Sequence, residues 1–61
     1  MKKLKELKKL EKRLQNNHEK IMKLLQQIQE GTLSEEEIAT QVHELYTERG
    51  ALNEEFERIA L

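Results

Sequence analysis

Two heptad stretches of apolar residues constrain the fold of this chain more than any other feature. In the first half, one helical face is marked by Leu7, Leu10, Leu14, Ile21, Leu24 and Ile28, with Asn17 as the one polar member of the series. In the second half, the same spacing holds for Ile38, Val42, Leu45, Leu52, Phe56 and Ile59, with Arg49 as the one polar member. Spacings of three and four residues predict an amphipathic helix in each half.

The segment Gly31–Ser34 predicts a turn between these helices. Gly31 can adopt the left-handed conformation that ends a helix without steric cost. Ser34 can cap the next helix, and Glu37, three residues later, completes a capping box. The sequence therefore predicts a single domain over residues 1–61, with a helix over 2–30, a turn over 31–34 and a helix over 35–60. Gly50 lies inside the second helix, but the heptad continues in phase through it, so one continuous helix is expected.

Folding the chain back at this turn pairs the two apolar faces along their length. Asn17, the polar member of the first series, then lies opposite Arg49, the polar member of the second. A shifted register would bury the charge of Arg49 against apolar side chains, so these two residues are expected to set the register. The fold class is an all-α, coiled-coil-like antiparallel hairpin of two helices.

The charge pattern favours the same alignment. Residues 1–30 contain nine Lys or Arg and four Glu, whereas residues 31–61 contain two Arg and eight Glu. Along one flank of the hairpin, Arg13 is expected near Glu55 and Lys20 near Glu48. The net charge of −1 thus hides two halves of opposite sign that attract each other.

The other flank, here called the interaction edge, has few charges and consists of Leu4, His18, Leu25, Ala39 and Tyr46. His18 and Tyr46 are expected to meet across it, either as a half-buried polar pair or as a contact sensitive to pH. A chain of 61 residues is marginally stable alone. We therefore expect the hairpin to dimerise through this edge into a four-helix bundle.

The composition excludes several function classes. The chain has no Cys, which rules out disulfides and thiolate metal sites. No apolar run approaches the roughly 20 residues of a membrane span, so a cytoplasmic protein without a membrane span is expected. The sequence predicts no catalytic residue, no metal ligand and no cofactor, and the protein is not expected to be an enzyme.

Two hypotheses about function follow. The first is a protein-interaction module that binds itself or another helical protein, and acts as a regulator or adaptor of another protein such as a transcription factor. The alternative is a hairpin that binds nucleic acid through its basic start. The candidate phosphate contacts are Lys2, Lys3, Lys5, Lys8, Lys9, Lys12 and Arg13.

Overall fold

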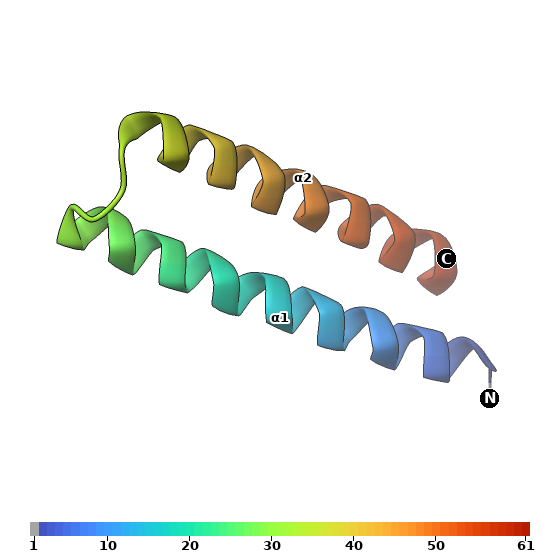
Figure 1. Cartoon of the computed structure of the whole chain (residues 1–61). Coiled ribbons are helices and arrows are strands. Elements are labelled where there is room, and N and C mark those ends of the chain that lie inside the picture. Colours follow the sequence, from blue (N-terminus) through green and yellow to red (C-terminus); the bar gives the residue numbers. More distant parts are fainter. Residues whose placement is uncertain (1) are drawn as a thin grey trace.

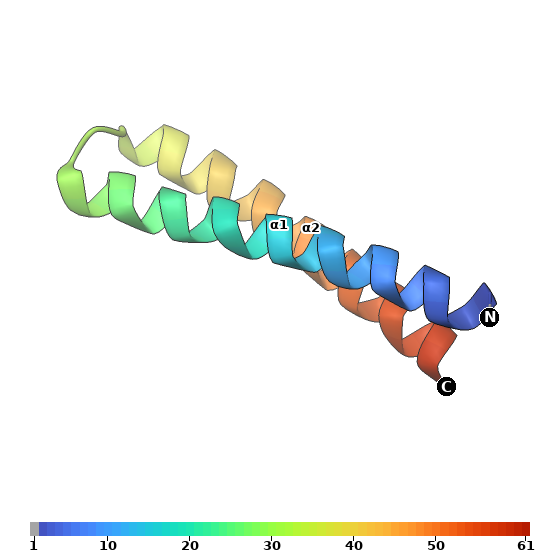
Figure 2. The same cartoon turned by 90° about the horizontal axis from the view of Figure 1, so that it is seen from below.

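The computed structural model describes residues 2–61 and contains two helices, α1 (Lys2–Glu30) and α2 (Glu35–Ala60). The helices pack against each other and run in opposite directions, so the start of α1 and the end of α2 lie at the same end of the rod (Figure 1). Seen after a quarter turn, α2 passes behind α1 near the middle, so the helices cross at a shallow angle (Figure 2). The all-helical hairpin expected from the sequence is confirmed.

The end of α1 is closed by backbone hydrogen bonds. Gly31 has φ +74°, the left-handed conformation expected of it. Its N–H donates to the Ile28 carbonyl (3.1 Å), and the Thr32 N–H donates to the Gln27 carbonyl (3.2 Å). This pair of bonds is a Schellman motif, which satisfies carbonyls that the helix end would otherwise leave without partners.

The start of α2 is fixed by the capping box. The Ser34 Oγ accepts from the Glu37 N–H (3.2 Å), and the Ser34 N–H donates to Glu37 Oε1 (3.3 Å). Glu35, Glu36 and Glu37 also place negative charge in the first turn, where the helix dipole is positive. These local contacts let α2 begin directly after the turn, so that it returns along α1.

The core is a single seam between the two helices. Buried there are Leu10, Asn17, Ile21, Leu24 and Leu52. The other seam residues are half-buried, except Arg49, which is exposed. α2 runs through Gly50 as one helix, as the unbroken heptad predicts.

Candidate interaction surface

Every member of the interaction edge is exposed to solvent. Leu4 is 52% exposed, Leu25 50% and Tyr46 49%. His18 and Ala39 are exposed as well. The hairpin itself therefore covers the large side chains of this edge only in part.

The structure brings two of these residues together on α1. His18 and Leu25 line one shallow surface hollow, and Met22 lies between them. Met22 is 53% exposed and was not among the residues predicted from the sequence. Its position four residues after His18 and three before Leu25 was the available signal, because residues at these spacings share a helix face.

Other members of the interaction edge lie apart from this hollow. Leu4 is near the start of α1, about four turns before His18. Ala39 and Tyr46 belong to α2. Within residues 2–61, no hydrogen bond joins His18 to Tyr46, so the expected meeting of the two remains a prediction.

The polar layer of the seam differs in part from the sequence prediction. Asn17 is 1% exposed, and its Nδ2 donates to the Leu45 carbonyl oxygen (3.0 Å) and to Glu48 Oε1 (2.9 Å). Arg49 is exposed, and no hydrogen bond joins it to Asn17 in the described part of the chain. Asn17 therefore contacts the expected turn of α2, but its partner is Glu48 and not Arg49. The reason is that Glu48 offers a carboxylate acceptor to the amide, whereas the charged guanidinium of Arg49 remains in water.

The charged flank has the expected arrangement. Arg13 and Glu55 line one surface hollow, and Lys20 and Glu48 line another. Farther toward the turn, Gln27 and Gln41 also share a hollow. Each hollow is lined from both helices, and the first two contain the pairs expected from the sequence, so this flank supports the antiparallel register.

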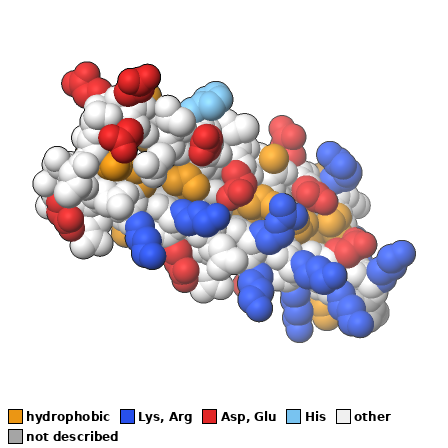
Figure 3. Space-filling view, in the orientation of Figure 1, with side chains coloured by type: hydrophobic (Ala, Val, Ile, Leu, Met, Phe, Trp, Pro, Cys, Tyr) orange, Lys and Arg blue, Asp and Glu red, His pale blue; other side chains and the backbone are white. Residues whose placement is uncertain are grey.

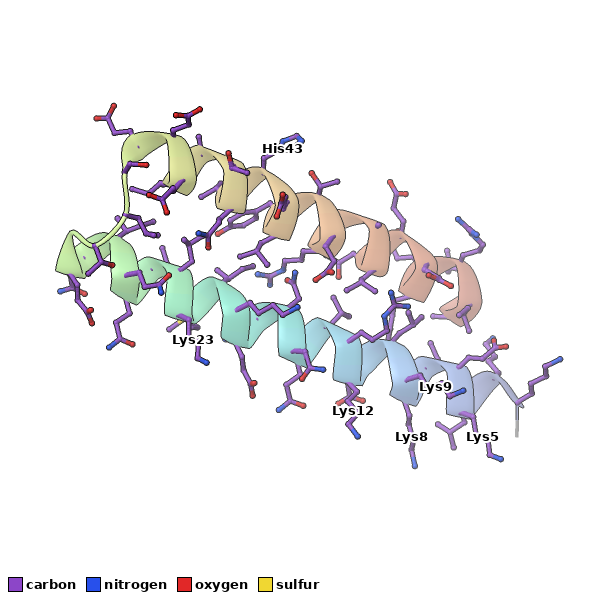
Figure 4. The ribbon with its side chains drawn as sticks, in the orientation of Figure 1. Lys5, Lys8, Lys9, Lys12, Lys23 and His43 are labelled. Atoms are coloured by element: carbon purple, nitrogen blue, oxygen red, sulfur yellow. The ribbon has the colours of Figure 1, made fainter. Side chains whose placement is uncertain are left out.

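The candidate phosphate contacts are all exposed: Lys2, Lys3, Lys5, Lys8, Lys9, Lys12 and Arg13. In the space-filling view, Lys and Arg side chains gather over the N-terminal half of α1, and most Glu side chains lie over α2 (Figure 3). The side chains of Lys5, Lys8 and Lys12 point away from α2, as Lys23 also does (Figure 4). These lysines are therefore turned away from the acidic helix.

The structure adds two observations on metals and membranes. Among residues 2–61, no group of three or more His, Cys, Asp or Glu side chains is placed to hold a metal ion. His43 points away from α1 (Figure 4). Neither of the described helices has a stretch that is long and apolar enough to span a membrane.

Comparison with known proteins gives no relative from which a role could be inferred. No family model, no curated protein and no solved structure matches this chain.

Proposed function

We propose that this chain is a non-enzymatic protein-interaction module that assembles through the interaction edge. The observation that carries the proposal is the exposure of Leu4, Leu25 and Tyr46, each about half accessible on a two-helix rod. Isolated exposed apolar residues are ordinary, but residues that share one flank of a small hairpin favour an interface. Self-association into a four-helix bundle would cover them.

The total surface of the hairpin supports the same proposal. The chain exposes 5253 Å². A compact protein of 7.3 kDa exposes about 4,200 Å². The excess, roughly 1,000 Å², is close to the ~800 Å² that each partner buries in an interface of standard size. The excess exposed area is therefore about the area that one additional helical layer would cover.

The shape of the molecule supports a role in binding and not in catalysis. The Cα atoms span 46 × 15 × 11 Å, so the rod is one helix thick in its narrowest direction. Enzymes generally bind substrates in concave pockets, and a rod of this thickness provides little depth for one. A regulator or adaptor of another protein, such as a transcription factor, fits a small homo-oligomeric hairpin.

Sedimentation equilibrium at micromolar concentration tests the proposal. We expect a mass above that of the 7.3 kDa monomer. The double variant Leu25→Glu/Tyr46→Glu should sediment as a folded monomer, because it introduces charges into the edge. A matched control is Asn16→Glu/Thr47→Glu, which adds the same charge at exposed positions outside the edge. A folded wild-type monomer, or assembly of the edge variant at wild-type strength, would contradict the proposal.

A second candidate function, binding of nucleic acid, is favoured by the direction of the lysines. Lys5, Lys8 and Lys12 point away from the acidic helix, so their charges are available to a polyanion (Figure 4). Mobility shifts of a short labelled duplex over a salt series test this candidate, since binding driven by lysines weakens steeply with salt. Replacing the three lysines with Glu should abolish the shift. Absence of a shift by the wild type at low salt would eliminate the candidate.

A further inference from the structure

The half of the interaction edge nearest the turn is free of full charges when histidine is neutral. On α1 it contains His18 and Leu25 with Met22 beside them, and on α2 it contains Ala39 and Tyr46. Most neighbouring positions along the same flank are uncharged as well, namely Gln15, Gln29, His43 and Gly50, and Glu36 beside the turn is the exception. Glu19 and Lys23 also line the hollow that His18, Met22 and Leu25 share. In a chain with 38% charged residues, such a face suits contact with another uncharged face.

The half of the interaction edge farthest from the turn is flanked by charged residues. Lys8 and Glu11 lie along this flank of α1, and Glu57 lies along the same flank of α2. The two helices also differ as wholes, because residues 1–30 have a net charge of +5 and residues 31–61 a net charge of −6. A partner must therefore offer an uncharged surface to the half nearest the turn, an acidic helix to α1 and a basic helix to α2.

We propose that the partner is a second copy of this chain, aligned with its turn at the same end. This inference rests on the proposed function and specifies the arrangement of the dimer. A twofold axis along the rod places α1 of each copy against α2 of the other. The basic helix then lies against the acidic one, and the uncharged halves meet each other.

The alternative alignment, with the turns at opposite ends, brings the uncharged half of one copy against the charged half of the other and brings like charges together. With the turns at opposite ends, the uncharged half of one copy covers Lys8, Glu11 and Glu57 of the other. This alignment also places α1 on α1 and α2 on α2, so the basic helices lie together and so do the acidic ones. Like-charge contact of this kind opposes association.

The aligned dimer also matches side chains by size and charge. Leu25 of one copy lies opposite Ala39 of the other, and Leu4 lies opposite Ala60 in the same way. Lys8 of one copy lies opposite Glu57 of the other, so the charged half of the edge also finds a complement. Large residues against small ones are the arrangement that lets helical layers interdigitate.

Distances between spin labels test the alignment. Because the chain has no Cys, a single Glu35→Cys variant of the full chain carries one label, beside the turn. With the turns together, the two labels of a dimer should lie about 20–30 Å apart, which is two to three helix diameters. With the turns at opposite ends, their separation approaches the 46 Å length of the rod.

A label at the middle of α2, placed by Thr47→Cys, is the control for dimer formation, because its separation is short in either alignment. Short distances at both sites support the proposal. A short distance at residue 47 with a long one at residue 35 overturns the alignment but leaves the proposed dimer in place. No distance at either site, together with a monomeric mass, overturns both.

Discussion

Asn17 of α1 holds two acceptors of α2 with one amide group. Its Nδ2 lies 3.0 Å from the carbonyl oxygen of Leu45 and 2.9 Å from Oε1 of Glu48. Asn17 is also the one buried polar side chain among residues 2–61, and its Oδ1 has no hydrogen-bond partner there. The seam thus contains a polar contact that requires a hydrogen-bond donor at the position of the Asn17 Nδ2 atom.

Asn17→Asp should destabilise the hairpin strongly, although the two side chains have nearly the same shape. The carboxylate would present oxygen in place of the donor, facing the Leu45 carbonyl and the Glu48 carboxylate. A buried group left without its partner costs about 1–3 kcal/mol, and more when it is charged. Urea unfolding followed by circular dichroism at neutral pH measures the loss.

The neighbouring asparagine provides the matched control for this substitution. Asn16 is exposed and lines a surface hollow with Arg13 and Lys20. Asn16→Asp should therefore keep the free energy of unfolding within about 0.5 kcal/mol of the wild type. Equal losses in the two variants would mean that the Asn17 amide does not join the helices.

Replacing Gly31 with alanine should lower the stability of the hairpin, whereas replacing Gly50 with alanine should raise it. A Cβ at Gly31 or at Gly50 would meet no atom within 4 Å, so the difference between them lies in the backbone. Gly31 has φ +74°, where an L-residue loses about 1–2 kcal/mol. Gly50 is inside α2, where alanine gains about 0.5–1 kcal/mol. Thermal melting should show a lower midpoint for Gly31→Ala and a higher one for Gly50→Ala, whereas shifts of the same sign would be inconsistent with this account.

Ser34→Ala should weaken the start of α2. The substitution removes the acceptor of the Glu37 N–H and the hydroxyl that donates to Glu37 Oε1 (3.0 Å). Loss of such a cap costs about 0.5–2 kcal/mol. Chemical denaturation measures it against Thr40→Ala, since Thr40 donates only to the Glu36 carbonyl of its own helix. Both variants should remain helical, and the serine variant should be the less stable one.

The sequence predicted the parts of this fold that local chemistry decides. Gly31, Ser34 and Glu37 determine the turn by backbone conformation and capping, which depend on neighbouring residues alone. The residues of the seam could be predicted from the spacing of apolar residues, because this spacing determines which residues share one face of each helix. The partner of Asn17 did not follow from spacing, since the choice between Glu48 and Arg49 depends on side-chain conformation and solvation. Met22 was missed because its position lies one row outside the heptad flank.

Leu24 and Leu25 are adjacent in sequence, but their substitution should affect different processes. Replacing Leu24 should weaken folding of the hairpin, and replacing Leu25 should weaken its association. Leu24 is 2% exposed in the seam, and Leu25 is 50% exposed on the interaction edge. Leu24→Ala should cost about 2–5 kcal/mol, because it leaves a cavity between the helices, and the loss should not depend on protein concentration. Leu25→Ala should match the wild type at high dilution and fall below it as concentration rises, because it weakens only the associated state.

Melting curves over a roughly hundredfold range of protein concentration distinguish these two effects, since the midpoint of an associating protein rises with concentration. The wild-type midpoint should rise most and that of Leu25→Ala least, while that of Leu24→Ala should be low throughout. If Leu25→Ala were as unstable as Leu24→Ala at high dilution, Leu25 would belong to the hairpin core. Its exposure could then no longer support an interface.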